Sequence, residues 1–282
     1  RIYRAIRRGE VRENKKLAKQ TYRLQLRDSI RIPPIQNYSA ESRASQQVPE
    51  ELMATLENSI IYEDEYLMVL NKPSGIAAHS GTGERWGVIE IMRASREHQP
   101  FLELAHRIDK ETSGCLVLAK TRRALLDAQQ SLQDETSMKE YTLLVKGQWQ
   151  VKNKRIEHAL DKHIDHTVGA KMMVDEQGKQ AVSIFSTIEL FSHNSLIKAA
   201  IETGRTHQIR VHAQQEGYPL VGDKRYGDFA HNREIAKLGF KRMFLHATQL
   251  KLKLRDLSQN YEFTAPMPSE LKTLCRQLRK QQ

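Results

Sequence analysis

The chain has 282 residues, enough for one large domain with a smaller module and a sizeable buried core. Hydrophobic residues make up 39% of it, and no stretch approaches the roughly 18 unbroken apolar residues of a membrane-spanning helix. Cys115 and Cys275 stand alone without CxxC spacing. This excludes a disulfide framework and a thiolate zinc site, and it predicts a reducing, cytoplasmic setting.

The net charge of +11 is concentrated at one end of the chain. Residues 1–31 hold eleven Lys and Arg residues against Glu10, Glu13 and Asp28, a net charge of +8. Only +3 is left for the rest of the chain, which is ordinary for a catalytic domain. We therefore expect a basic module attached to a nearly neutral body.

The first part of the chain is predicted to be a small module. Apolar residues recur at helical spacing in residues 2–12, which predicts a short basic helix. Short strand-like pieces follow and end at Pro33 and Pro34, which stop regular structure. Residues 36–50 are polar, rich in Ser and Gln, and lack either periodicity. The expected domains are a module at 1–35, a linker at 36–55 and a catalytic domain at 56–282.

The remaining chain is predicted to mix strands with helices. Runs of apolar and β-branched residues predict strands at 60–62, 66–70, 101–107, 115–119, 141–145 and 195–201. Helical spacing predicts helices at 122–133, at 206–216 with Thr206 as N-cap and Gly217 as stop, and at 269–280 with Leu271, Leu274, Cys275 and Leu278 on one side. Because no regular βαβ rhythm occurs, an α+β fold with a mixed, mainly antiparallel sheet is favoured over a doubly wound one.

A polar loop at residues 106–114 (HRIDKETSG) joins two of these strands. It places Asp109 among cations, which favour the ionised carboxylate, and an ionised Asp can act as a nucleophile or a general base. The alternative is that Asp109 only caps a turn or pairs with Arg107.

A second polar peptide, residues 203–212 (TGRTHQIRVH), lies at a strand-to-helix junction. Arg205 and Arg210 could each hold a carboxylate or a phosphate in a two-pronged contact, and a structural ion pair is the alternative. A metal site is rejected here because His207 and His212 do not share one helical face.

Three other features carry weaker signals. Tyr141, in the peptide Lys139-Glu140-Tyr141, could pack in a sheet or could support a flipped base by stacking. The peptide 71–75 (NKPSG) indicates only a rigid turn after a strand. The group Asp161, His163 and His166 is expected to be a solvated loop rather than a ligand set, and residues 155–180 contain no clear motif.

Taken together and in order, these motifs resemble the RluA-type pseudouridine synthases. The resemblance runs from about residue 60 to the C-terminus and rests on Asn71-Lys72-Pro73, His106-Arg107-Ile108-Asp109 with Thr112-Ser113-Gly114, Lys139-Glu140-Tyr141 and Gly204-Arg205-Thr206-His207-Gln208-Ile209-Arg210. Ile108 replaces the commoner Leu, a swap of similar volume. The first 35 residues resemble the last part of an S4 RNA-binding domain that lacks its opening helix. Residues 9–16 and the Ile-Pro-Pro ending resemble the branch of the family that acts on the bacterial large ribosomal subunit.

The resemblance implies a pseudouridine synthase fold and the conversion of uridine to pseudouridine in 23S ribosomal RNA, without metal or cofactor. Asp109 matches the family's catalytic aspartate, which could attack the base, attack the ribose or abstract a ribose proton. Tyr141 matches the tyrosine that stacks on the target base, Arg210 the arginine paired with the aspartate, and Arg107 the residue that fills the stack when the base leaves.

The other candidates for RNA binding share a polar or cationic side chain near these motifs or in the basic module. They are His106, Thr112, Lys72, Lys139, Arg205, His207, Arg4, Arg7, Arg8, Lys15 and Lys16. The expected partner is ribosomal RNA, with no membrane, and the expected state is a monomer. The alternatives are a ribosome-associated RNA-binding protein without chemistry, a synthase acting on tRNA and, least favoured, a hydrolase using Asp109 with His106 or His207.

Overall fold

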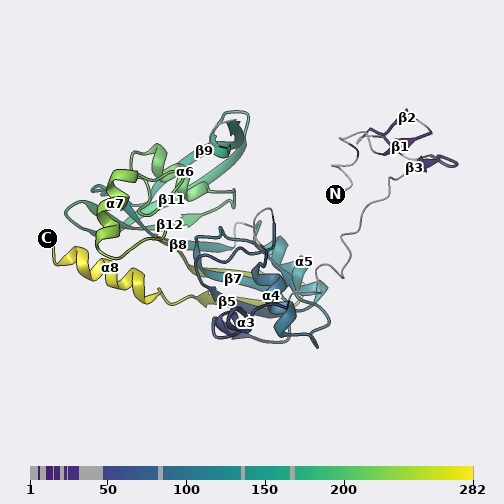
Figure 1. The fold of residues 1–282 in the computed structure, drawn as a ribbon, viewed down its shortest axis with the longest axis horizontal. Helices are drawn as coiled ribbons and strands as arrows, with labels where there is room; N and C mark the ends of the chain where they lie inside the picture. The colour runs from purple at the N-terminus through teal and green to yellow at the C-terminus, as the bar shows by residue number, and fades with distance from the viewer. Residues whose placement is uncertain are drawn as a thin grey trace. The chain divides into compact units, whose positions relative to one another are not determined.

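The chain divides into two compact units, Arg1–Gln47 and Val48–Gln282 (Figure 1). The structure is a computed structural model. The residues that the structure describes are 6, 11–14, 16–19, 22–23, 25–31, 47–81, 85–134, 137–165 and 169–281.

The described part of the first unit contains three short antiparallel strands. They are β1 (Arg12–Glu13), β2 (Lys16–Leu17) and β3 (Ile30–Arg31), in the order β2-β1-β3. The Asp28 carboxylate accepts hydrogen bonds from Asn14 Nδ2 and the Gln25 amide, both at 2.7 Å, and so closes the loop before β3. The predicted strand-like pieces are confirmed. Most of the helix predicted over 2–12, including Arg4, Arg7 and Arg8, lies outside the described residues, as does Lys15. Of its described residues, Ile6 is helical, whereas Arg12 belongs to β1.

Among the described residues, the second unit has one eleven-stranded sheet in the order β10-β9-β11-β12-β8-β13-β7-β5-β4, with β14 beside β13 and β6 beside β7. The strands are β4 (Ile60–Glu63), β5 (Leu67–Lys72), β6 (Glu103–Leu104), β7 (Ser113–Ala119), β8 (Met138–Lys146), β9 (Lys154–Asp165), β10 (Gly169–Val174), β11 (Lys179–Leu190), β12 (Asn194–Ile201), β13 (Leu245–Leu254) and β14 (Gln259–Thr264). Only the pair β7 and β13 is parallel within this described sheet. The predicted mixed, mainly antiparallel α+β fold is confirmed.

Two segments differ from the sequence-based expectation. The strand predicted over 101–107 is reduced to β6, which pairs Glu103 and Leu104 with β7. Beyond it the Ala105 amide still donates to the Val117 carbonyl, but the Val117 amide donates to the His106 ring and not to a backbone carbonyl. Strands β9, β10 and β11 account for most of the described residues between 154 and 190, and both β10 and β11 pair antiparallel with β9. Asp161 and His163 therefore lie on a strand, where His163 Nε2 is 2.9 Å from Asp175 Oδ2, and not in a solvated loop.

Helices cover the sheet of the second unit. They are α3 (Glu50–Glu57), α4 (Val88–Ser95), α5 (Arg122–Ser131), α6 (Gln208–Gln215), α7 (Phe229–Lys237) and α8 (Ser269–Arg279). Helix α3 begins inside the segment 36–55 that was expected to be a linker, because its Leu56 is fully buried in the core. The four apolar residues predicted to share one side of the last helix, now α8, are all buried, as expected.

Strand β8 separates two cores by the alternation of its side chains. Leu143 packs in a core with Ile209 of α6, whereas the next residue, Leu144, packs with Leu271 and Leu274 of α8. Successive side chains of a strand point to opposite faces, so α6 and α8 cover opposite faces of the sheet. This arrangement places the start of α6 over one face of β8.

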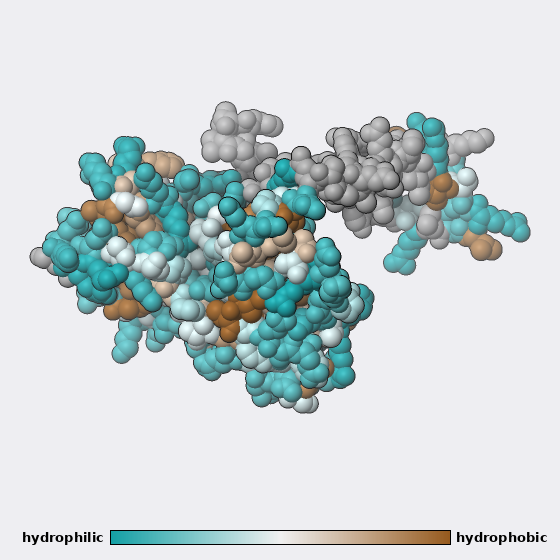
Figure 2. Space-filling view, turned by 60° about the horizontal axis from the view of Figure 1, so that its bottom comes forward, coloured by the Kyte–Doolittle hydropathy of each residue, from teal (hydrophilic) through white to brown (hydrophobic). Residues whose placement is uncertain are grey.

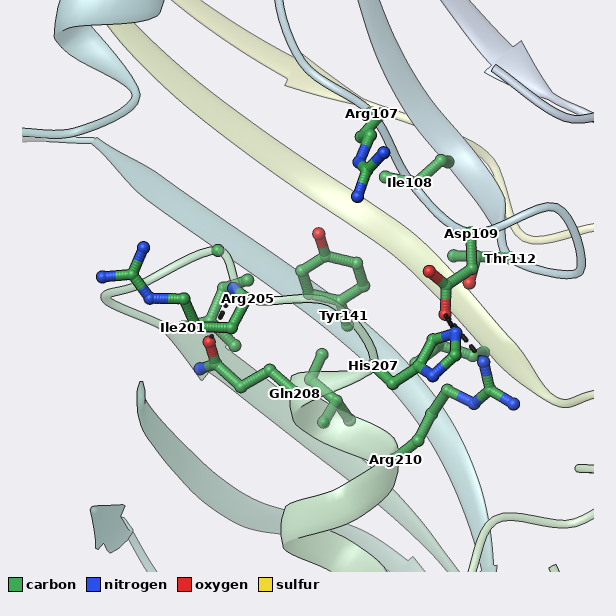
Figure 3. A pocket seen from close by; sticks show the side chains of 13 residues that line it. Arg107, Ile108, Asp109, Thr112, Tyr141, Ile201, Arg205, His207, Gln208 and Arg210 are labelled. Atoms are coloured by element: carbon green, nitrogen blue, oxygen red, sulfur yellow. Dashed lines mark hydrogen bonds and ion pairs between the residues drawn. The ribbon is translucent and has the colours of Figure 1, made fainter. Parts of the chain in front are cut away.

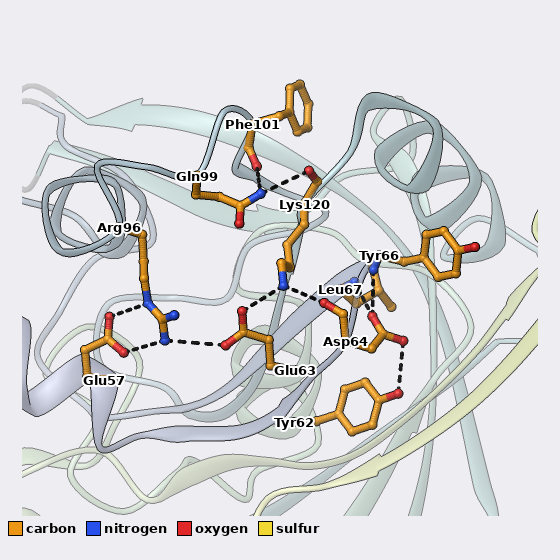
Figure 4. A network of polar contacts seen from close by, with 10 residues as sticks. All are labelled: Glu57, Tyr62, Glu63, Asp64, Tyr66, Leu67, Arg96, Gln99, Phe101 and Lys120. Atoms are coloured by element: carbon orange, nitrogen blue, oxygen red, sulfur yellow. Dashed lines mark hydrogen bonds and ion pairs between the residues drawn. The ribbon is translucent and has the colours of Figure 1, made fainter.

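A polar network ties α3 and α4 to the edge of the sheet (Figure 4). Arg96 forms a two-pronged contact with Glu57 at 2.8 and 2.7 Å. Lys120, just after β7, donates to Glu63 at 2.8 Å and to the Asp64 carbonyl at 2.5 Å. These contacts close the acidic turn between β4 and β5 at the start of β5 and the end of β7, whereas the Asp109 loop lies at the opposite ends of these two strands.

The surface of the second unit is mainly polar. Figure 2 shows hydrophilic residues over most of the face that it presents, with hydrophobic residues in separate patches. The most exposed large apolar side chains of this unit, Phe229, Leu126 and Ile188, lie on three different elements. In the part of the chain that the structure describes, no helix is long and apolar enough to cross a membrane.

Candidate active site

The loop that carries Asp109 runs from β6 to β7, and the turn after β5 donates hydrogen bonds to its carbonyl groups. The Gly75 amide donates to the Lys110 carbonyl at 2.9 Å, and Ser74 Oγ donates to the Glu111 carbonyl at 2.7 Å. Lys72 Nζ also donates to the Lys110 carbonyl, at 3.1 Å. The two peptides that the sequence singled out separately are therefore one structural unit, and the turn fixes the loop backbone.

Arg210, on α6, makes the closest charged contact of Asp109. Its Nη1 donates to Asp109 Oδ2 at 2.9 Å, while its Nε and Nη2 donate to Asp223 at 2.7 and 2.9 Å. Burial opposes the charge of Arg210, but Asp223 and Asp109 more than offset this effect and raise its pKa. The guanidinium therefore stays charged beside Asp109, whose side chain is 26% exposed.

Asp223 and Tyr226 complete the support of Arg210 from the loop between α6 and α7. Asp223 is fully buried and also accepts hydrogen bonds from the amides of Arg225 and Tyr226 at 2.8 and 3.0 Å. The Tyr226 ring lies 4.9 Å from the guanidinium carbon of Arg210. Sequence reasoning missed both residues. The available signal was the glycine-bounded turn 222–227 (GDKRYG), in which Gly222 has φ +75° and a Cβ there would lie 1.9 Å from the Arg242 carbonyl.

His207 lies next to the ion pair at the start of α6. It is the N-cap of this helix, with the left-handed φ of 55°, so the predicted cap at Thr206 is wrong. Its Nε2 is 3.7 Å from Asp109 Oδ2, and its Nδ1 is 2.8 Å from the Tyr226 hydroxyl. Burial lowers the pKa of His207 to about 4, although the Asp109 charge opposes the change, so the imidazole is neutral at pH 7.

Tyr141 stands on β8 between small neighbours. Its register partners are Ala199 on β12 and Ala247 on β13, which leave room above the sheet for the phenol ring. The Ala247 carbonyl would lie 2.2 Å from a Cβ on Gly114, so only glycine lets β7 pair with β13 here. Burial, together with the Asp109 charge, raises the pKa of Tyr141 well above its usual range, and the hydroxyl stays protonated.

Four of these side chains line one cavity: Asp109, Tyr141, His207 and Arg210 (Figure 3). Its apolar walls are Ile108, Ile201, Ile209, Leu245 and the Tyr141 ring, and its polar wall contains Asp109, His207 and Arg210. A flat aromatic wall facing a carboxylate and its guanidinium suits a planar polar ring such as a nucleobase. Two exposed arginines, Arg107 and Arg205, also line the cavity.

Comparison with known proteins agrees with this chemistry. A family model described as RNA pseudouridylate synthase matches residues 66–215, a segment that contains Asp109, Tyr141 and Arg210. The ribosomal large subunit pseudouridine synthase C of Haemophilus influenzae (strain Rd) is 42% identical over 278 residues, which cover 99% of this chain and 86% of that protein. The chain belongs to the RNA pseudouridylate synthase family.

Other relatives of this synthase support the assignment. The ribosomal large subunit pseudouridine synthase C of Escherichia coli (strain K12) is 41% identical, covering 99% of this chain and 88% of that one. Among solved structures, human RNA pseudouridylate synthase domain containing 4 superposes with a TM-score of 0.66 at 21% identity, over 81% of this chain and 96% of that one. Human domain containing 1 gives 0.62 at 25% identity, over 78% and 94%. The predicted family and fold are confirmed.

Three predicted RNA contacts of the synthase bond to its own backbone: Lys72 and Lys139 are buried, and His106 is half-buried. Lys72 is fully buried, with Nζ donating to the carbonyls of residues 73, 76 and 110, and burial lowers its pKa to about 7. His106 Nε2 accepts the Val117 amide at 3.1 Å, and Lys139 Nζ donates to the Leu132 carbonyl at 2.7 Å. The ammonium of the fully buried Lys72 therefore serves the fold, contrary to the prediction, whereas contact of His106 and Lys139 with RNA stays a prediction.

The other predicted contacts of the synthase keep positions compatible with RNA. Thr112, although 2% exposed, lines the cavity with Arg107, Arg205 and His207. Lys16 is exposed on β2. Across the residues that the structure describes, no group of three or more His, Cys, Asp or Glu side chains is arranged to hold a metal ion.

Proposed function

We propose that this synthase isomerises uridines of large-subunit ribosomal RNA to pseudouridine, with Asp109 as the catalytic carboxylate. The observation that carries the proposal is the direct contact of Asp109 with Arg210 at 2.9 Å, on the wall of a cavity that also contains the Tyr141 ring. The relatives that cover nearly the whole chain carry the name of the large-subunit enzyme. Their substrate class is the one proposed here.

The arrangement supplies each requirement of the reaction. The charged guanidinium of Arg210 contacts the Asp109 carboxylate, which lines the cavity and is proposed to act on the nucleotide. The Tyr141 ring supports an extruded uracil by stacking. Taking a base out of its stack costs about a few kcal/mol, and the exposed Arg107 is placed to offset part of this by filling the gap.

RNA affinity is proposed to come from two regions. Near the cavity, Arg107 and Arg205 present exposed guanidinium groups that suit phosphates. The first 35 residues are proposed to be a partial S4-like module that adds sequence-independent, salt-sensitive binding through its excess of cations. The cytoplasmic setting and the monomeric state stay predictions.

The substrate class is tested in cells that lack this protein. Pseudouridines are mapped in ribosomal RNA and tRNA from the deletion strain, and from the same strain carrying either the wild-type gene or the Asp109→Asn variant. We expect sites in the large-subunit RNA to disappear and to return only with the wild-type gene. Loss of tRNA sites alone would favour the tRNA enzyme, and unchanged RNA would contradict the proposal.

A further inference from the structure

Tyr226 touches both side chains that flank Asp109. Its ring faces the Arg210 guanidinium at 4.9 Å, and its hydroxyl oxygen is 2.8 Å from His207 Nδ1. Only 3% of Tyr226 is exposed, so it does not present itself to RNA. It therefore supports two residues of the cavity wall without lining the cavity itself.

The hydrogen bonds of the Tyr226 hydroxyl determine which nitrogen of His207 carries the proton. The Met172 amide, which can only donate, donates to this oxygen at 3.0 Å. The hydroxyl has one proton of its own, and within the described residues His207 Nδ1 is the acceptor that lies in reach. If Nδ1 donated instead, the hydroxyl proton would be buried without an acceptor, which is unfavourable.

The hydroxyl of Tyr226 therefore donates to Nδ1, and the neutral imidazole carries its proton on Nε2. Nε2 is the nitrogen that faces Asp109, 3.7 Å from Oδ2. This separation is too long for a hydrogen bond, and a shift of less than about 1 Å would close it. Catalytic hydrogen bonds are often long before substrate binds and tighten in the complex.

We propose that His207 is a positioning residue for the Asp109 carboxylate, fixed as the Nε2–H tautomer by the Tyr226 hydroxyl. Arg210 then holds Oδ2 from one side, and the imidazole N–H approaches the same oxygen from another. The second oxygen of Asp109 is left for the nucleotide. This inference rests on the proposed catalytic role of Asp109, but the tautomer itself can be measured without RNA.

The first test is the imidazole ¹⁵N spectrum of the full-length protein at pH 7 without RNA. The His207 signals are assigned by their absence in His207→Gln. We expect a protonated Nε2 and an unprotonated Nδ1 in the wild type, and a mixture of the two neutral tautomers in Tyr226→Phe. A protonated Nδ1 in the wild type would overturn the proposal, whatever the RNA substrate is.

The second test measures single-turnover rates and RNA affinity. Tyr226→Phe keeps the ring against Arg210 but removes the hydroxyl, so the rate should fall about three- to tenfold with RNA affinity unchanged. His207→Gln keeps an N–H group near the Nε2 position and should retain more activity than His207→Leu. Both replacements meet the same left-handed backbone at residue 207, so their difference reports the donor and not the backbone.

Tyr261→Phe is the matched control. It also removes a partly buried hydrogen bond of a tyrosine hydroxyl, the one of 2.7 Å to Asp64, but this bond lies away from the cavity. Its rate should stay at the wild-type value. Equal rates for Tyr226→Phe and Tyr261→Phe, or equal losses in the two His207 variants, would overturn the proposal. If the wild type itself formed no pseudouridine in large-subunit RNA, the proposed function would fail while the tautomer assignment could still hold.

Discussion

Asp223 orients Arg210 by two hydrogen bonds, at 2.7 Å to Nε and 2.9 Å to Nη2. These contacts direct the remaining nitrogen, Nη1, to Asp109. Because Asp223 is fully buried, the orientation of the active-site guanidinium is set by a carboxylate that does not line the cavity. The charge of Arg210 is thus shared between a structural carboxylate and the proposed catalytic one.

Asp223→Asn should damage stability and catalysis together. It leaves Arg210 with half of its buried counter-charge, and breaking such a pair costs about 3 kcal/mol. We expect urea unfolding to show this decrease and single-turnover assays to show at least a tenfold slower rate. The control is Glu234→Gln, which breaks the exposed pair of Glu234 with Lys237 and should change neither quantity. A wild-type rate in Asp223→Asn would contradict this role.

The Tyr141 ring is predicted to act as a shelf for the base. Stacking on an aromatic side chain contributes about 1–3 kcal/mol per base, so Tyr141→Leu should lower kcat/KM by about five- to 150-fold. Tyr141→Phe keeps the ring and should lose less than the Leu variant, measured with the same RNA fragment. If the Phe and Leu variants were equally impaired, the shelf would not be the main contribution of Tyr141.

Periodicity in the sequence predicted the elements that have one apolar and one polar side. The last helix is an example, since Leu271, Leu274, Cys275 and Leu278 recur at helical spacing and all four are buried in α8. Strand β9 and its neighbours were missed because β9 contains many charged residues, so that apolar and polar residues alternate only weakly along it. Helix α3 was missed because its segment has only one fully buried residue, Leu56.

The site was predictable only in part for a similar reason. Asp109, Tyr141 and Arg210 were found through motifs, and the structure brings them to one cavity. Asp223 and Tyr226 follow Arg210 by 13 and 16 residues, and no local pattern says that the loop after α6 folds back onto the helix. The Lys72 ammonium likewise bonds to one carbonyl 38 residues away, that of Lys110, besides the nearby carbonyls of residues 73 and 76.

The stability of the protein should fall in mild acid. Burial lowers the pKa of His212 and of His246 to about 4, and both side chains are fully buried. Between about pH 6.5 and 4 the unfolded chain binds protons that the folded chain does not, so the free energy of unfolding falls as the pH falls. Each histidine contributes about 1.4 kcal/mol per pH unit in this window.

Urea unfolding at pH 5, 6 and 7 measures this slope. His212→Asn removes one of the two groups and should make the dependence on pH less steep. A free energy of unfolding that stayed constant or rose between pH 6.5 and 5 would contradict the neutral, buried state of these histidines.

Deletion of residues 1–34 should weaken the binding of ribosomal RNA fragments and reduce its dependence on salt. The segment contains eleven basic residues, and each phosphate contact that is lost lowers the slope of log K against log salt by about 0.7–0.9. Fluorescence anisotropy titrations at several KCl concentrations give the slope for both proteins. The same affinity and slope in the deletion variant would dismiss the proposed role of the module.

The most direct measurement is the single-turnover formation of pseudouridine by purified Asp109→Asn on a large-subunit RNA fragment, with RNA affinity measured in parallel. The amide keeps the size of the side chain and can still accept from Arg210, but it has no negative charge. We predict a rate at least about a thousandfold below the wild type, with affinity changed less than about threefold. Pseudouridine formation at the wild-type rate would show that the carboxylate of Asp109 does not perform the reaction.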